Sequence, residues 1–427
     1  MSHATSRLIA ILAANRGGAQ QGITSVCSAH PLVIRAALEL ARERGQLALI
    51  EATCNQVNQF GGYTGMQPAD FARRVRETAT NLGLGEDDVI LGGDHLGPQP
   101  WRREHAETAM AKAVAMVEAF VGAGFAKIHL DCSMRCADDP EILPEAVIAE
   151  RAARLAEAAE GAAGVHKPVY IIGTEVPPPG GMGAGHAIVP TDPAHVQMTL
   201  DLHRQAFAAR GLEEAFGRVV GMVVQPGVDF GNEEVVYFDP SGATALSRAL
   251  DDAPGLVFEA HSTDYQRPEG YKALVAHHFA ILKVGPAASF ALREALYGLQ
   301  AVEAELVPAA QRSGLRAALE AAMLARPGDW SGHYDGTPEH QAYLRHFSYS
   351  DRLRYYWTEP GVVAAVEQLF ANLERTGLPL PLVSQYLPLH YGAIASGALS
   401  ANAPDVAVAQ VKAALAPYAD ASLAHQA

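Results

Sequence analysis

The amino-acid sequence predicts a (β/α)8 TIM barrel with a C-terminal helical extension. Eight short apolar segments occur between residues 23 and 284, and a longer amphipathic stretch follows each of them. This alternation is typical of parallel strands joined by helices, and eight such units form a closed barrel. A doubly wound open sheet is the alternative, but no Gly-x-Gly-x-x-Gly motif follows the first apolar segment.

The expected strands are short and apolar, as buried parallel strands are. They cover residues 23–28, 47–52, 89–94, 127–131, 169–173, 219–225, 256–261 and 281–284. The helices between them are expected at residues 31–44, 68–82, 103–123, 141–160, 193–209, 241–250 and 268–277. Several of these helices begin with Pro, which is favoured in a first helical turn because its missing N–H is not needed there.

The rest of the chain is expected to be helical. Residues 289–326 form a long helix or a pair of helices, and a turn-rich break follows at residues 327–335. Residues 336–427 are helical with interruptions at Pro360, Pro379, Pro381 and Pro388. We therefore divide the chain into a barrel of residues 1–325 and an extension of residues 326–427 that packs on the barrel.

Composition and charge exclude several classes of function. With 32 basic and 47 acidic residues, the chain carries a formal charge of −15, which argues against non-specific nucleic-acid or anionic-membrane binding. No apolar stretch is long enough to span a membrane, and residues 8–14 are expected to lie in an ordinary first helix. The four scattered cysteines are expected to be free, buried thiols, and the expected location is the cytoplasm.

Ionisable and polar side chains lie at the ends of most of the expected strands. In a (β/α)8 barrel the carboxyl ends of the strands form the active-site face. Such side chains are costly to bury unless they are paired or bound to a metal, so their accumulation points to a site. They are Glu51, Asp94, His95, His129, Asp131, Glu175, Gln225, Asp229, Glu259, His261 and Lys283.

Two imidazoles and a carboxylate are the candidate metal ligands. His95 follows two glycines and stands beside Asp94, a candidate for proton transfer. His261 follows Glu259 by two residues, so both side chains point to the same face of the strand. With Glu175, these imidazoles would form an open Zn²⁺ or Mn²⁺ site. The alternative is a buried hydrogen-bonded network without a metal.

The eighth strand and the following helix offer a candidate phosphate site. Barrels often bind phosphate at the loops after strands seven and eight, and Lys283, Ser289 and Arg293 lie there. Ser289 is equally explained as a helix cap. A Schiff base on Lys283 is the weaker alternative, because metal-type residues lie nearby. The aromatic and basic segment 346–357 is expected to dock the extension onto the barrel, with Arg352 or Arg354 reaching a phosphate as the lesser alternative.

Five motifs resemble the Z-subunit family of tagatose-1,6-bisphosphate aldolase, whose members are often labelled probable tagatose-6-phosphate kinases. The motifs are GGDHLGP at residues 92–98, HLDCSM at 129–134, IGTEVPPPGG at 172–181, EAHSTDY at 259–265 and LKVGPA at 282–287. The resemblance covers essentially the whole chain and implies a TIM barrel related to class II aldolases. The sequence has no P-loop or kinase Gly-rich loop, which disfavours the kinase label.

The resemblance also implies roles for particular residues. Asp94 and His95 are similar to the acid and the metal ligand of zinc-dependent Y-type aldolases, and His261 and Glu175 match further residues of their sites. The middle metal-binding histidine and the Gly-Gly-Ser phosphate loop of those aldolases are missing. Gln225 or Asp229 is therefore an alternative to Glu175 as the third ligand.

Two functions follow from this resemblance. One is a Z-type subunit in galactitol- or tagatose-type carbohydrate metabolism that supports the activity and stability of a catalytic Y subunit. The other is a stand-alone metal-dependent ketose or ketose-phosphate 4-epimerase or aldolase that uses retro-aldol chemistry. In that enzyme Asp94, with Asp131 or Glu259, would move protons, and the metal, zinc or manganese, would polarise substrate oxygens.

Overall fold

The computed structural model describes residues 1–174 and 188–423, and its centre is a closed barrel of eight parallel strands. The strands are β1 (Ile23–Cys27), β2 (Ala48–Thr53), β3 (Val89–Leu96), β4 (Lys127–Leu130), β5 (Val169–Ile172), β6 (Val219–Val224), β9 (Val257–Ala260) and β10 (Ile281–Val284). They follow one another around the barrel in chain order, and β10 closes the ring by pairing with β1. The predicted TIM barrel is confirmed.

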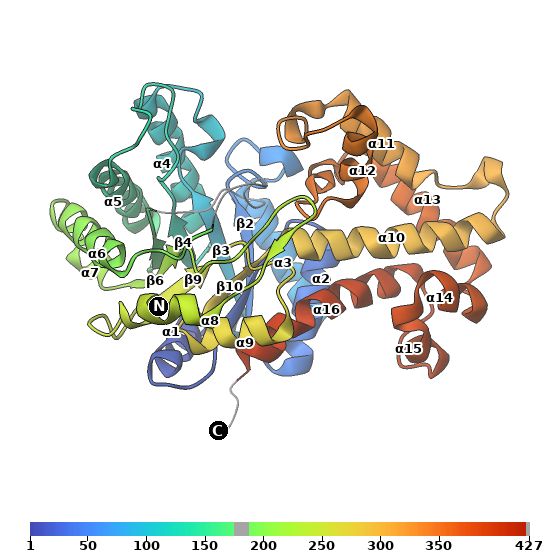
Figure 1. The fold of residues 1–427 in the computed structure, drawn as a ribbon, viewed down its shortest axis with the longest axis horizontal. Helices are drawn as coiled ribbons and strands as arrows, with labels where there is room; N and C mark the ends of the chain where they lie inside the picture. Colours follow the sequence, from blue (N-terminus) through green and yellow to red (C-terminus); the bar gives the residue numbers. More distant parts are fainter. Residues whose placement is uncertain (175–187, 424–427) are drawn as a thin grey trace.

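Helices surround the barrel and cover its outer face (Figure 1). Those of the barrel are α2 (Pro31–Arg44), α3 (Pro68–Asn81), α4 (Ala106–Gly122), α5 (Glu145–Ala162), α6 (Pro193–Ala208), α7 (Glu213–Phe216), α8 (Pro240–Arg248), α9 (Pro268–Ala276) and α10 (Pro286–Leu306). A short antiparallel pair, β7 (Asp229–Phe230) and β8 (Val235–Val236), lies between β6 and α8. The expected first helix is present as α1 (His3–Arg16), and its Leu8 and Leu12 join an apolar cluster with residues of the barrel strands.

Further α-helices follow α10, and all of them but the first lie within residues 326–427, the extension expected from sequence. They are α11 (Leu315–Ala325), α12 (Pro338–Phe347), α13 (Pro360–Thr376), α14 (Leu380–Tyr386), α15 (Tyr391–Ala395) and α16 (Ala403–Ser422). The last of them, α16, returns to the barrel, where Gln46 donates a hydrogen bond to the Ala419 carbonyl at 2.8 Å. In Figure 1, α16 runs beside α2, α9 and α10. A domain boundary at residue 325 stays a prediction.

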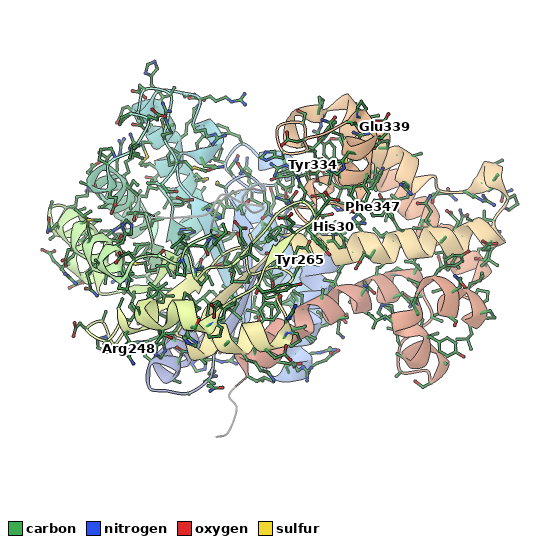
Figure 2. The ribbon with its side chains drawn as sticks, in the orientation of Figure 1. His30, Arg248, Tyr265, Tyr334, Glu339 and Phe347 are labelled. Atoms are coloured by element: carbon green, nitrogen blue, oxygen red, sulfur yellow. The ribbon has the colours of Figure 1, made fainter. Side chains whose placement is uncertain are left out.

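An aromatic contact joins the extension to the mouth of the barrel. Tyr265 donates a hydrogen bond to the Tyr349 carbonyl at 2.7 Å, and both rings pack against Phe290 at the start of α10. Figure 2 shows Tyr265 where the two parts meet, with Tyr334 and Phe347 in the extension above it. The segment 346–357 therefore docks the extension, as expected from its aromatic residues.

Two further findings bear on the chain as a whole. None of the helices within the described residues is long and apolar enough to cross a membrane. Cys27, Cys54, Cys132 and Cys136 are all buried free thiols, as their scattered positions predict. Burial raises the pKa of Cys27 well above its usual value, so this thiol is protonated at neutral pH.

Candidate metal centre at the barrel mouth

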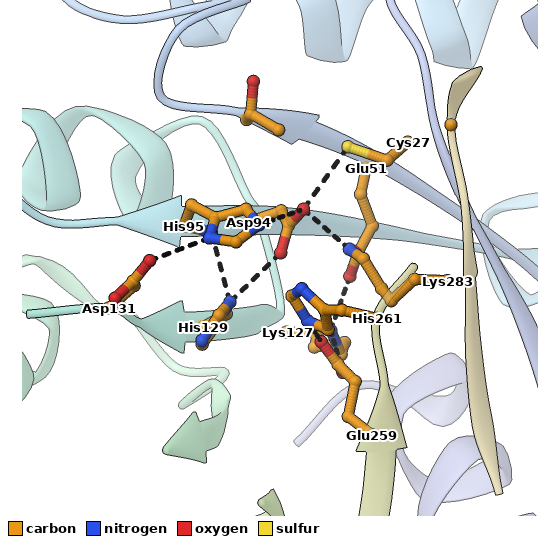
Figure 3. A network of polar contacts seen from close by, with 12 residues as sticks. Cys27, Glu51, Asp94, His95, Lys127, His129, Asp131, Glu259, His261 and Lys283 are labelled. Carbon is orange, nitrogen blue, oxygen red and sulfur yellow. Dashed lines mark hydrogen bonds and ion pairs between the residues drawn. The ribbon is translucent and has the colours of Figure 1, made fainter. Parts of the chain in front are cut away.

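Three buried histidines meet at the carboxyl end of the strands. His95 lies on β3, His129 on β4, and His261 directly follows β9. Their ring centroids are 5.2 Å apart for His95 and His129, 4.9 Å for His95 and His261, and 5.3 Å for His129 and His261. Figure 3 shows the three rings with the carboxylates around them. The structure thus brings together the two predicted imidazole ligands, His95 and His261, and adds His129.

Two carboxylates orient two of these imidazoles. His95 Nδ1 donates to Asp131 Oδ2 at 2.7 Å, and His261 Nε2 donates to Glu259 Oε1 at 2.9 Å. Burial raises the pKa of both carboxyl groups, but the charges and hydrogen bonds of neighbouring groups outweigh burial and hold each pKa below its usual value. The opposite ring nitrogens, His95 Nε2 and His261 Nδ1, are the ones left to bind a metal. Metal-binding histidines commonly have this arrangement.

The contacts of the two His129 ring nitrogens show whether this site fits a metal ion. His129 Nδ1 lies 3.1 Å from Asp94 Oδ1, and when Nδ1 donates to this carboxylate the lone pair lies on Nε2. This Nε2 is buried and has no hydrogen-bond partner within residues 1–174 and 188–423. A buried polar atom without a partner is costly, and a ligated cation removes that cost.

Asp94, His129, Glu259 and His261 each offer a ligand atom, and these four atoms lie within 4.8 Å of one another. Imidazole with carboxylate suits Zn²⁺ or Mn²⁺. The residues present therefore fit a divalent metal.

Close backbone packing around β3 places Asp94 and His95. A Cβ atom on Gly92 would lie 2.2 Å from Glu51 Oε1, and one on Gly97 would lie 1.6 Å from the Asp131 carbonyl, so both positions require glycine. Between them the register of β3 against β4 shifts, and His95 adopts a φ of 50°. With this irregularity β3 runs to Leu96, beyond its predicted end. The left-handed backbone conformation of His95 is one that β-strand residues rarely adopt.

A buried chain of ion pairs lies beneath the histidines. Lys127 Nζ is 2.7 Å from Glu51 Oε1 and 2.6 Å from Glu259 Oε2, and none of the three side chains is exposed. Lys283 Nζ is 2.9 Å from Asp94 Oδ2 and also contacts Glu51. Burial lowers the pKa of Lys283, but Asp94 and Glu51 outweigh this and raise it well above its usual value. The ion pairs therefore run without a break from Asp94 to Glu259.

A cavity opens above this cluster. Its wall includes Asp94, His95, His261 and Lys283 from the cluster, Asp264 from the loop after β9, and Arg354 and Tyr355 from a 3₁₀ helix at Arg352–Tyr356. Asp131 and Glu259, by contrast, do not line it. Of the three carboxylates predicted to move protons, Asp94 is thus the one in contact with the space where a substrate would bind.

The predicted phosphate residues do not come together. Lys283 faces Asp94 and Glu51, whereas Ser289 and Arg293 contact Asp351, at 2.6 Å and 3.3 Å respectively. Arg293 also stacks on Phe290, with its guanidinium carbon 3.9 Å from the ring centroid. Neither Ser289 nor Arg293 lines the cavity above the histidines, and their role in binding phosphate stays a prediction.

The third metal ligand also stays a prediction. Glu175 lies outside the described residues. Gln225 Oε1 accepts from the backbone N–H groups of Gly227 and Val228, and Asp229 Oδ1 accepts from that of Phe230. Neither Gln225 nor Asp229 belongs to the group of four potential ligands described above, and His95 lies outside it too.

Sequence reasoning missed two features of the site. His129 was named only as a strand-end residue, and Lys127 was not considered. A signal for both was available, because Lys127 and His129 are two residues apart on a short strand and must share its inner face. A lysine inside an apolar strand requires buried carboxylates, which Glu51 and Glu259 supply.

Comparison with known proteins agrees with this architecture. The profile of the family described as D-tagatose-1,6-bisphosphate aldolase subunit GatZ/KbaZ-like matches residues 8–423. A protein of Agrobacterium fabrum named D-tagatose 6-phosphate 4-epimerase is 51% identical over 421 residues, which are 97% of this chain and 98% of that protein. A crystal structure from Sinorhizobium meliloti, described as a probable tagatose 6 phosphate kinase, is 50% identical with a TM-score of 0.87 and covers 94% of this chain and 100% of that one. The resemblance found in the sequence is confirmed: the chain belongs to the GatZ/KbaZ-like family of D-tagatose-1,6-bisphosphate aldolase subunits.

Proposed function

We propose that the chain is a divalent-metal-dependent 4-epimerase of a ketohexose 6-phosphate. The observation that carries this proposal is the set of three buried imidazoles beside Asp94, two of which, His95 and His261, line a cavity in the barrel mouth with Asp94. The name of the Agrobacterium relative, a tagatose 6-phosphate 4-epimerase, supports the same reaction. A scaffold without catalysis has no need for so many buried ionisable groups in one place, because each of them is costly to bury.

Inversion at C4 can proceed by cleavage and re-addition. The C4 hydroxyl loses its proton and the C3–C4 bond breaks. C4 becomes the aldehyde carbon of a three-carbon phosphate, and the bonding electrons pass to the enediolate of the C1–C3 fragment. After the aldehyde turns, the enediolate adds to its opposite face, and the alkoxide at C4 regains a proton. No atom or electron is gained or lost. Polarisation of the C2 carbonyl is the chemistry that a zinc or manganese ion supplies when bound by His95, His129 and His261.

The chain's own carboxylates divide the remaining work. Asp94 lines the cavity, and we assign it to accept the proton of the C4 hydroxyl and to return it, while Lys283 pairs with its Oδ2 at 2.9 Å. Asp131 and Glu259 hydrogen-bond to His95 and His261 and act as positioning residues for these imidazoles. This assignment keeps Asp94 as the proton-transfer residue and gives the other two a different role.

Metal content and turnover test the proposal together. The purified chain is expected to hold about one divalent ion and to convert D-tagatose 6-phosphate into its C4 epimer, D-fructose 6-phosphate, measured with a coupled assay. Chelation should abolish turnover and added Zn²⁺ or Mn²⁺ should restore it. His95→Ala and His261→Ala should lose the ion, whereas His105→Ala, at an exposed histidine before α4, should keep it. A metal-free chain without turnover, or unchanged metal content in both site variants, contradicts the proposal.

The family description supports a second proposal, a partnership with a catalytic Y-type aldolase subunit. Here the chain is expected to raise the specific activity and thermal midpoint of a Y subunit when the two are mixed. Size-exclusion chromatography of the mixture is expected to show one complex. A Y subunit whose activity, midpoint and elution volume do not change on mixing rules this partnership out.

A further inference from the structure

Helix α10 begins at the end of β10, the position where (β/α)8 barrels commonly bind phosphate. A side chain of the protein already takes this position. Asp264 Oδ1 accepts the backbone N–H of Gly285 at 3.1 Å and that of Ala287 at 2.8 Å. Asp264 also lines the cavity above the histidines.

No amide of the first turn of α10 remains for an external anion. Pro286 has no N–H, and the Ala288 N–H donates to the Gly285 carbonyl at 3.1 Å. The other two N–H groups, of Gly285 and Ala287, are those bound by Asp264. A phosphate could therefore bind here only by displacing the carboxylate.

The loop holds Asp264 firmly in this place. Ser262 and Tyr265, two residues before and one after, have φ values of 53° and 63°, which turn the loop back towards β10. Thr263 Oγ1 donates to the Lys283 carbonyl at 2.5 Å, and Tyr418 of α16 donates to the Thr263 carbonyl at 3.0 Å. Residues other than glycine adopt such φ values only where surrounding contacts enforce them. Asp264 is 2% exposed, so displacing it would disturb a packed loop.

One cation of the cavity wall, Arg354, makes no salt bridge in the described part of the chain, although the charges of Asp264 and Asp351 act on it from nearby. Its guanidinium donates to the carbonyls of Ser350 and Asp351 and to the Tyr355 hydroxyl. Lys283, on the same wall, is bound by Glu51 and Asp94. A guanidinium held by neutral oxygens keeps its charge and further N–H donors for a phosphate.

We propose that the barrel mouth accepts one phosphate group, on Arg354, and that Asp264 excludes a second one from the start of α10. The ligand is then a ketose monophosphate and not a ketose bisphosphate. This inference rests on the proposed function for the sugar itself, and it makes Asp264 the residue that determines specificity between the two classes. An ionised carboxylate both fills the amide site and repels a second phosphate.

Calorimetric titration of the metal-bound chain tests the inference, with binding affinity as the readout. The probes are D-fructose 6-phosphate and D-fructose 1,6-bisphosphate at about pH 7.5, above the pKa of about 6 to which burial raises Asp264. We expect the bisphosphate to bind the unmodified chain roughly tenfold more weakly or worse, because like charges meet at α10. Equal affinity for the two probes overturns the inference.

Three variants separate the contributions. Asp264→Ala frees the backbone amides of Gly285 and Ala287 and should make the affinities for the monophosphate and the bisphosphate similar. Asp264→Asn removes the charge alone and should reduce the difference between these two affinities. Arg354→Met should weaken the binding of D-fructose 6-phosphate roughly tenfold, as expected on losing a charge-assisted contact. Asp239→Ala removes an exposed cap at the start of α8 and should keep the wild-type preference.

Unchanged discrimination in both Asp264 variants, or unchanged monophosphate affinity in Arg354→Met, overturns the inference. If Asp264→Ala does not fold, the affinities of the Asp264→Asn variant and of the unmodified chain still test the inference. A chain without epimerase turnover that keeps an Asp264-dependent preference for the monophosphate would instead disprove only the proposed reaction.

Discussion

Asp94→Asn is expected to lower kcat for 4-epimerisation by roughly 10²–10⁴-fold, the usual contribution of a proton-transfer residue. The substitution keeps the shape of the side chain, but an amide oxygen cannot accept and return the proton of the C4 hydroxyl. Steady-state kinetics should show the loss in kcat, with KM changed much less, because substrate binding does not depend on this proton transfer.

Two measurements separate this role from a structural one. Elemental analysis of Asp94→Asn should give the wild-type metal content, whereas loss of the ion would show that Asp94 is a ligand. Asp131→Asn is the matched control, because Asp131 contacts His95 and does not line the cavity. That variant should weaken metal binding by roughly 10–100-fold and recover activity at high metal concentration. An Asp94→Asn enzyme with near wild-type kcat contradicts the assignment.

Lys127→Met is expected to have the largest effect on stability. Its ammonium is fully buried between Glu51 and Glu259, and Glu51 keeps Lys283 as a partner when Lys127 is lost. Glu259 then loses its lysine partner inside the barrel. Breaking a buried ion pair in this way costs about 3–5 kcal/mol of the free energy of unfolding.

Urea denaturation measures this loss directly. Arg210→Met serves as the control, because Arg210 pairs with Glu150 and Glu157 on the surface and such pairs contribute little. The Arg210 variant should unfold close to the wild-type midpoint, and the Lys127 variant well below it. A Lys127→Met chain with wild-type stability would contradict the role of Lys127 as the partner of these buried carboxylates.

The barrel could be predicted from sequence because its signals are local. Apolar runs such as residues 219–224 and Pro-initiated helices such as α2 and α9 reflect burial and first-turn geometry, which act within a few residues. The clustering of His95 and His261 was also predictable, because parallel strands place their carboxyl ends on one face. Both inferences needed only the strand order.

The remaining features depend on contacts between distant segments. The orphaned Nε2 of His129 arises from how three strands converge, and the turning of Arg293 towards Asp351 depends on where the extension docks. The bulge at His95 follows from glycines that contact Glu51 and Asp131 across strand pairs. No periodic pattern in the sequence predicts these contacts, because each depends on tertiary packing.

The return of α16 to the barrel has a consequence for synthesis. The Ser422 carbonyl accepts the N–H of Gly22 just before β1, and Tyr418 holds the Thr263 carbonyl beside Asp264. A chain emerging from the ribosome can close its strands before α16 is made, yet the flank between the first and last strands stays open until the twenty residues of α16 appear. The loop that carries Asp264 is therefore fastened by a helix made after the barrel, and a chain that still lacks α16 has a barrel without its finished mouth.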